Sequence, residues 1–169
     1  MNRRALHNAR MNAEESTLLR QLLLKQPVAA LATLHRGDPA VSMVPFAWHV
    51  QDHSVIVHVS QLATHTQDMS AHDAVSLLVT GTLSQADTPL ALPRVSITGH
   101  AQKVDPASAV YASARDAYLS KHPDAQPLFD FADFSLFRVS PQHLRFVAGF
   151  GRAMTVMPNQ FEELMQTKA

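Results

Sequence analysis

The chain has 169 residues, of which 46% are hydrophobic and 17% charged, a composition typical of one globular domain. Fourteen basic residues balance fourteen acidic ones, which argues against a nucleic-acid-binding protein, because such proteins carry a cationic surface. The sequence has no cysteine, which excludes disulfides, thiolate metal ligands and a cysteine nucleophile. It also lacks a secretory signal and any apolar run near the roughly 18 residues of a membrane span, so we expect a cytoplasmic protein with no membrane partner.

The first predicted element is an amphipathic helix over residues 13–26, with Asn12 as its N-cap and Glu15 in a capping-box position. The polar residues 1–11 are expected to be flexible. Short apolar or alternating runs then predict strands, and helical periodicity predicts further helices. The expected strands are 28–34, 40–48, 55–60, 75–80, 93–104, 135–139, 143–147 and 153–156, and the expected helices are 61–71, 106–121 and 158–167.

This order of elements favours an α+β, mainly β fold in a single domain, 1–169. Tight turns join most of the strands, which indicates an antiparallel barrel with flanking helices rather than a parallel βαβ sheet. Pro45 has no N–H to donate, so it marks a sheet edge, a bulge or a position covered by a ligand. The polar face from Arg94 to Gln102 is either solvated or part of a wet subunit interface.

The stretch from His58 to Met69 runs from a strand into a helix and brings hydroxyls, imidazoles and backbone N–H groups together. Such a helix start can bind an anion, in particular a phosphate, through His65 and Thr66. The alternative is that these residues only build the helix terminus, as polar residues commonly do.

No metal site is expected from the histidines, because His49, His53 and His58 straddle a hairpin turn and no acidic cluster completes a ligand set. No phosphate-binding glycine loop, nucleophile elbow or pair of carboxylates is apparent either. Catalytic residues are therefore unknown from the sequence. This pattern suits a protein whose cofactor carries the chemistry.

Four motifs together point to a family: Pro-Ala-Val-Ser-Met-Val-Pro-Phe (39–46), His-Val-Ser-Gln-Leu-Ala-Thr-His-Thr (58–66), Ser-Leu-Leu-Val (76–79) and Gly-Phe-Gly-Arg (149–152). The chain resembles the pyridoxamine 5'-phosphate oxidase-like FMN-binding split-barrel proteins, nearest their haem-utilisation branch. The resemblance implies a six-stranded antiparallel split barrel that forms a homodimer, with FMN at the subunit interface. The haem-utilisation branch commonly carries an additional C-terminal domain, which we do not expect within these residues.

The resemblance also implies which residues contact the cofactor. Strand 40–48 would meet the flavin ring, the stretch 58–66 would lie beneath the ring and hold the phosphate, and Gly-Phe-Gly-Arg would reach the site, with the partner subunit as its expected source. The family's Arg-Lys pair at the phosphate end is replaced here by Thr64-His65, so hydroxyl, imidazole and backbone groups would hold the phosphate. The implied contacts are Ser42, Val44, Pro45, Phe46, His58, Val59, Ser60, His65, Thr66, Phe150, Gly151 and Arg152.

The resulting hypothesis is an FMN-dependent oxidoreductase acting on an unidentified small substrate. The alternative is a non-catalytic protein that binds flavin, haem or another tetrapyrrole, with His58 or His65 as a candidate axial ligand.

Overall fold

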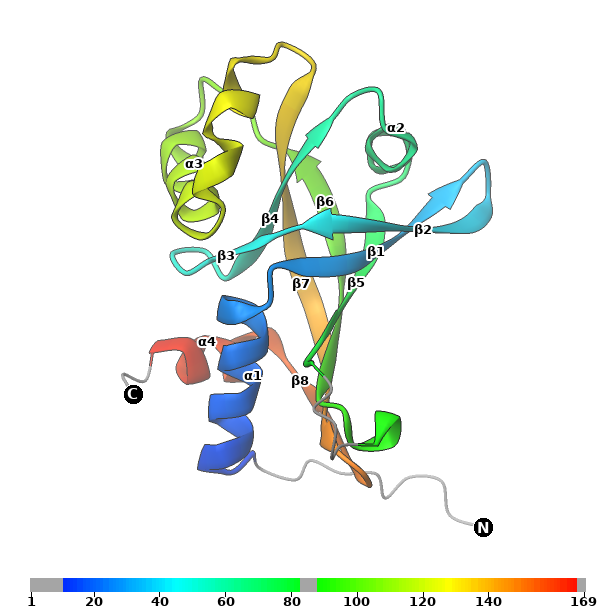
Figure 1. The fold of residues 1–169 in the computed structure, drawn as a ribbon, viewed down its shortest axis with the longest axis vertical. Helices are drawn as coiled ribbons and strands as arrows, with labels where there is room; N and C mark the ends of the chain where they lie inside the picture. The colour runs from blue at the N-terminus through cyan, green and yellow to red at the C-terminus, as the bar shows by residue number, and fades with distance from the viewer. Residues whose placement is uncertain (1–10, 83–87, 167–169) are drawn as a thin grey trace.

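The computed structural model describes residues 11–82 and 88–166, and an antiparallel sheet that curls into a split barrel lies at its centre (Figure 1). The sheet has eight strands in the order β2-β1-β5-β6-β7-β4-β3, with β8 beside β7. The predicted fold class is confirmed, although the strand number is eight rather than six. The strands are β1 Val28–His35, β2 Asp38–Pro45, β3 Ala47–His49, β4 Ser54–Ser60, β5 Ala74–Thr80, β6 Arg94–Lys103, β7 Phe134–Gly149 and β8 Arg152–Val156.

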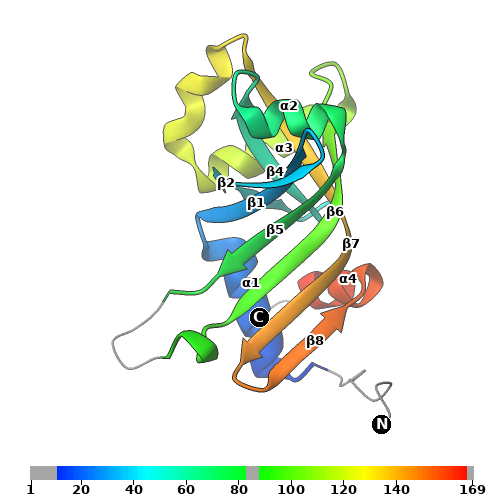
Figure 2. The same ribbon diagram turned by 90° about the vertical axis from the view of Figure 1, so that its right-hand side faces the viewer.

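The long strand β7 pairs with three others: its first part with β4, its second part with β8, and most of its length with β6 (Figure 2). The prediction of two strands separated by Ser140-Pro141 is therefore wrong. Pro141 lies opposite Gly99 at a register shift in the β6–β7 pairing, where the ladder tolerates a residue without an N–H. A Cβ added to Gly99 would lie 2.2 Å from the Ser140 carbonyl oxygen, so only glycine allows this close approach.

The predicted strand 40–48 is interrupted at Phe46, whose N–H donates to the Pro27 carbonyl oxygen at 3.2 Å, one position beyond the last paired residues of β1 and β2. Residues on either side of this break form β2 and β3, at opposite edges of the sheet. Pro45 is the last residue of an edge strand, which is one of the three alternatives that its missing N–H left open.

Helix α1 begins with the predicted capping box: the Glu15 N–H donates to Asn12 Oδ1 at 2.9 Å, and the Asn12 N–H donates to Glu15 Oε2 at 3.0 Å. Helix α3 starts later than predicted, because Asp105 Oδ1 accepts from the Ala107 N–H and closes a turn before the helix. The predicted flexible residues 1–10 lie outside the described part of the chain. The helices are α1 Ala13–Lys25, α2 Thr64–Ala71, α3 Ala109–Lys121 and α4 Pro158–Gln166, with short 3-10 segments η1 Pro89–Ala91 and η2 Pro123–Asp130.

Strand β4 is buried on both faces, since two apolar clusters meet on it. Val55, Val57 and Val59 belong to the cluster inside the barrel, which α1 and α4 close with Leu19, Leu23 and Phe161. On the opposite face, Ile56 packs with Ala114 and Tyr118 of α3. Helices α3 and η2 therefore cover one side of the barrel, while α2 follows β4 and packs against β1, β2 and β6 (Figure 1).

Candidate functional site

The end of β4 is tied to the loop that precedes β7. The Ser60 hydroxyl donates to Asp133 Oδ2 at 2.6 Å, and the Gln61 N–H donates to the Asp133 carbonyl oxygen at 2.7 Å. Ser60 Oγ in turn accepts from the Leu62 N–H at 3.1 Å. Ser60, a predicted cofactor contact, therefore already positions the turn into α2.

Helix α2 is fixed to β1 by the buried carboxylate of Asp68, which accepts from the Thr33 hydroxyl and from His35 Nδ1, both at 2.8 Å. Burial raises the pKa of Asp68, but the hydrogen bonds from His35 and Thr33 and the nearby imidazoles outweigh it and hold the pKa below its usual value. Burial lowers the pKa of His65, and Asp68 only partly opposes this shift. His65 is thus neutral at pH 7 and offers a hydrogen bond rather than a charge.

A pocket of about 440 Å³ lies beside α2, and Thr66, one of the residues that line it, has a buried hydroxyl without a partner. Thr66 is 3% exposed, and its Oγ1 has no hydrogen-bond partner, an arrangement that costs roughly 1–3 kcal/mol. The helical hydroxyls of Thr17 and Ser70 instead donate to the carbonyl oxygens of Ala13 and Thr66, both at 2.9 Å. The α2 pocket, as we call it, is lined by Gln61, Thr66, Gln67, Ser70, Ala71, Lys103 and Phe137.

A neighbouring pocket of about 650 Å³ shares Ser70, Lys103 and Phe137 with the α2 pocket, so the two form one groove between α2 and the β6–β7 ladder. His100 and Asp73 line this second part and pair at 3.1 Å. The sequence did not identify Lys103 as a site residue. In the sequence, Lys103 is only a cation at the end of a predicted strand. Its proximity to Thr66 depends on the folded structure, which the local pattern does not show.

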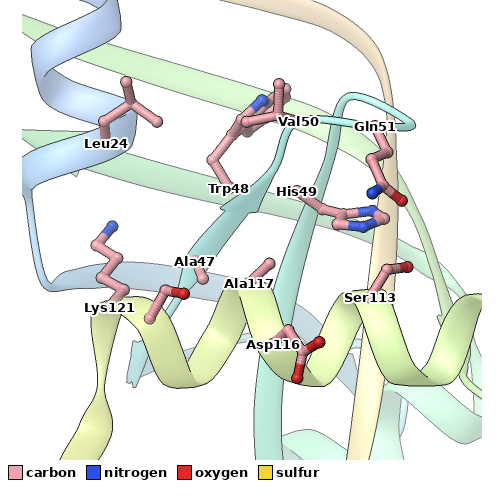
Figure 3. A pocket seen from close by; sticks show the side chains of 11 residues that line it. Leu24, Ala47, Trp48, His49, Val50, Gln51, Ser113, Asp116, Ala117 and Lys121 are labelled. Atoms are coloured by element: carbon pink, nitrogen blue, oxygen red, sulfur yellow. The ribbon is translucent and has the colours of Figure 1, made fainter.

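A larger pocket, of about 710 Å³, lies between the C-terminal end of α1, β3 and α3 (Figure 3). His49 Nδ1 lies 2.6 Å from Asp52 Oδ1, and its buried Nε2 has no partner. Lys121 Nζ donates to the Leu23 carbonyl oxygen at 3.1 Å and lies 3.7 Å from the centre of the Phe46 ring. This α3 pocket is lined by Leu24, Ala47, Trp48, His49, Val50, Gln51, Ser113, Asp116, Ala117, Ser120 and Lys121.

His58 lies in the cluster beneath α3 and is 6% exposed. Its ring stacks on Phe129, with centroids 3.8 Å apart, and lies 5.7 Å from the ring of Tyr118 and 5.2 Å from that of Phe134. This burial lowers the pKa of His58 to about 4, and Nδ1 has no partner. The structure thus separates the His58 side chain from the α2 pocket, and its predicted role beneath a flavin stays a prediction.

The structure does not gather the other predicted contacts around the α2 pocket. The side chains of Val44, Phe46 and Val59 belong to the barrel interior, whereas Pro45 is exposed at the end of the edge strand. Ser42 is half-buried on β2. Their contacts with a cofactor, through side chain or backbone, therefore also stay predictions.

The turn between β7 and β8 carries Phe150, which is 79% exposed, and Gly151, whose φ of +75° favours glycine. The neighbouring Arg152 pairs with Glu15 of α1 in the same chain, with Nε 2.7 Å from Oε1. Burial raises the pKa of Glu15, but hydrogen bonds from the Asn12 N–H and from Arg152 lower it below its usual value. Arg152 therefore joins the C-terminal hairpin to the N-terminal helix, and its approach to a partner's site is untested.

Within residues 11–82 and 88–166, no three histidine, aspartate or glutamate side chains gather as a metal site would require. In the same part of the chain, no helix is both long enough and apolar enough to cross a membrane.

Comparison with known proteins finds one matching family model and several relatives whose names refer to haem. A family model described as "CREG, beta-barrel" matches residues 11–163. A chloroplastic heme oxygenase, HOZ, of Arabidopsis thaliana is 40% identical over 119 residues, which are 70% of this chain but 35% of HOZ. The heme oxygenase HutZ of Vibrio cholerae is 27% identical over 128 residues, covering 75% of this chain and 72% of HutZ.

Among solved structures, a heme binding protein from Mycobacterium smegmatis is 27% identical with a TM-score of 0.79. The match covers 88% of this chain and 60% of that protein. The chain thus spans about a third of HOZ and three fifths of the mycobacterial protein.

Proposed function

We propose that this chain, which belongs to the CREG beta-barrel family, is a haem-binding protein that uses the groove beside α2. The observation that carries the proposal is the 40% identity to HOZ over most of this chain, supported by the mycobacterial heme binding protein with the same fold.

The residues around the groove fit such a ligand. Thr66 supplies a buried hydroxyl without a partner, and Lys103 supplies a cation. His65 is half-buried at the start of α2 and lines neither part of the groove, yet it is the better of the two histidines that the sequence offered as axial ligands, because His58 is enclosed by three aromatic rings. When bound, haem supplies an iron centre for redox chemistry, while these side chains hold and orient the ligand.

FMN is the second candidate, and the same unpartnered hydroxyl favours it, because a phosphate is a strong acceptor. With FMN as its ligand, the protein would be the FMN-dependent oxidoreductase expected from the sequence, acting on a small substrate. The phosphate would be held without the family's Arg-Lys pair.

We also propose a homodimer, formed through the outer face of β1, β2 and β5. Val41 and Met43 are 70% and 67% exposed on the edge strand, beside Ala32 and Ala30 of β1, and Leu78 of β5 follows in register. A face of small and apolar side chains on neighbouring strands is what an obligate subunit interface needs. Met43→Glu should convert a dimer to a monomer in light scattering after gel filtration, whereas the exposed control Leu90→Glu should not. A monomeric wild-type protein would contradict the proposal.

The decisive experiment titrates the purified protein with hemin and, separately, with FMN. A Soret band that saturates with one hemin per chain supports haem binding, and quenched flavin fluorescence supports FMN. The variant His65→Ala with Thr66→Ala should weaken the preferred ligand about tenfold or more, since both contacts proposed for it at the start of α2 are lost. His143→Ala, which changes an exposed histidine on β7, is the matched control. A wild-type protein that binds neither ligand contradicts the proposed function.

A further inference from the structure

We infer that His100 is the side chain that binds the haem iron, through Nε2, and that Asp73 is the positioning residue that orients its ring. This inference rests on the proposed function and names the iron ligand within the same groove, where the sequence offered His58 or His65. The porphyrin supplies the in-plane nitrogens of haem, so the protein needs to add an axial side chain rather than a cluster of ligands. A single histidine in the correct tautomer is therefore sufficient.

The first support is the hydrogen bonding of the His100 ring. Nδ1 lies 3.1 Å from Asp73 Oδ2, and a carboxylate oxygen accepts, so the ring hydrogen is on Nδ1. Nε2 lies 2.7 Å from the side-chain amide nitrogen of Gln142, which donates, so Nε2 presents its lone pair. The two contacts specify the same tautomer. It is the one in which a histidine binds a metal through Nε2 while a carboxylate holds the Nδ1–H.

The second support is that a ligand in the groove can reach Nε2. The His100 side chain is 46% exposed, and Gln142, which occupies Nε2, is itself an exposed side chain that can turn away. His58 is instead buried beneath aromatic rings, and His65 lines neither part of the groove. Among the described residues that line either part, His100 is the only histidine.

The third support is the way in which the fold fixes this pair of side chains. Asp73 lies between α2 and β5, and its carbonyl oxygen accepts from the Ala101 N–H at 2.7 Å, beside His100 on β6. On the other side of β6 the register shifts next to Gly99, so Gln142 is the extra residue of a β-bulge in β7. Bulges are frequent beside ligand sites, where they re-aim a side chain. The backbone thus holds both partners of the His100 ring in place.

The fourth support is the wall of the groove beside His100. The part that His100 lines also includes Met69, Ala101 and Phe137, and Phe137 continues into the α2 pocket. Small and apolar side chains with a few placed polar groups are typical of sites for flat organic cofactors. The groove therefore offers contacts for a porphyrin ring and a ligand for its iron in the same place.

The test titrates the complete chain with hemin and records the Soret band and the resonance Raman spectrum. His100→Gly should weaken hemin binding about a hundredfold and shift the Soret band, and added imidazole should restore the wild-type spectrum by replacing the missing ring. Asp73→Asn should weaken binding about tenfold and lower the iron–histidine stretching frequency of the reduced protein, because an amide is a weaker acceptor for the Nδ1–H. Gln142→Ala should bind hemin at least as tightly as the wild type.

His143→Gly, which changes an exposed histidine of β7, and His65→Gly are the controls that should keep the wild-type Soret position. Circular dichroism checks the fold of each variant, and His100→Gln carries the Soret comparison if His100→Gly does not fold.

The outcomes separate this inference from the proposed function. Hemin binding with an unchanged spectrum in His100→Gly overturns the inference and leaves haem binding standing. A changed spectrum in His65→Gly alone also overturns it and assigns the iron to His65. A wild type that binds FMN but not hemin overturns the inference and leaves FMN as the ligand. A wild type that binds neither overturns both proposals.

Discussion

The α2 pocket and the α3 pocket each contain a lysine and a buried polar atom without a partner, yet the two lysines differ. Lys121 in the α3 pocket is held by a carbonyl oxygen and an aromatic ring, and burial lowers its pKa to about 8. Lys103 in the α2 pocket has no such contacts within the described chain. The lysine of the larger α3 pocket thus already serves the fold, whereas the lysine of the smaller α2 pocket does not.

We expect the largest effect from Asp52→Ala, on the α3 side of the molecule. This substitution should strongly destabilise the fold without affecting ligand binding. Asp52 accepts from Ser54 at 2.6 Å, from Arg138 at 3.0 Å and from His49, so its loss leaves two buried groups without a partner. We expect a loss of about 3 kcal/mol in the free energy of unfolding, measured by urea denaturation. Asp116→Ala, an exposed carboxylate lining the same pocket, should change it little. Lost haem or FMN affinity in folded Asp52→Ala would show that the α3 side takes part in binding.

The second prediction concerns pH and His58. Its pKa in the folded state, about 4, lies below the unfolded value of about 6.5, so acid favours the unfolded chain, which takes up the proton first. His58 alone should account for a loss of about 2 kcal/mol between pH 7 and pH 5, so His58→Phe should lose about 2 kcal/mol less than the wild type, with His65 contributing to the remainder in both proteins. The pH range from 7 to 5 lies above the more acidic range in which three carboxylates with lowered pKa values lose their stabilising contribution. These carboxylates are Glu15, Asp52 and Asp68.

The measurement is urea denaturation at each pH, with exposed His143→Phe as the control that should keep the wild-type slope. Unchanged ligand affinity in His58→Phe would place His58 in the structural cluster. A large loss of affinity would restore the flavin contact predicted from the sequence.

The third prediction is that Thr66→Val changes the free energy of unfolding in the opposite direction, by stabilising the protein. In the ligand-free protein, removing a hydroxyl that has no partner should raise the free energy of unfolding by about 1 kcal/mol. Thermal denaturation of the variant beside Thr17→Val would measure this, since the Thr17 hydroxyl has a partner. A destabilised Thr66→Val would mean that the hydroxyl is satisfied within the protein.

The smallest expected effect is that of Arg152→Gln. The Arg152 side chain is 47% exposed, and its pair with Glu15 is therefore worth only about 0.5 kcal/mol. Ligand affinity should not change if Arg152 serves only to join the terminal elements. A loss of affinity beyond about threefold would support its predicted approach to the cofactor.

The sequence predicted the fold well where the signal was local. The capping box at Asn12 and Glu15 needs only four neighbouring residues, and it is present. Prediction from the sequence failed where residues far apart in the chain decide the geometry. Pro141 looked like a strand breaker because its partner Gly99, some forty positions earlier, could not be seen in the local pattern. The same limit hid Lys103, whose proximity to Thr66 exists only once β6 and α2 have packed together.

The cofactor contacts predicted from the sequence stay predictions for a related reason. The stretch from His58 to Met69 was singled out from its residue types, and the α2 pocket borders part of it. Which side chains of β2 and β4 face a ligand depends on the curl of the sheet, since β4 is buried on both faces. The alternation of residue types along a strand assigns side chains to two faces. It does not predict that other elements will cover both faces, as they do for β4.

The long strand β7 has a consequence for how this protein is made. Its residues 134–139 complete the pairing of β4. During synthesis, this edge of β4 therefore stays unpaired until roughly eighty more residues have been added. Until then, an apolar strand with an open edge is available to other chains, which is a known route to aggregation. A truncation that ends before β7 should therefore yield insoluble protein rather than a smaller barrel, and rapid folding should depend on the full hairpin of β7 and β8 being released.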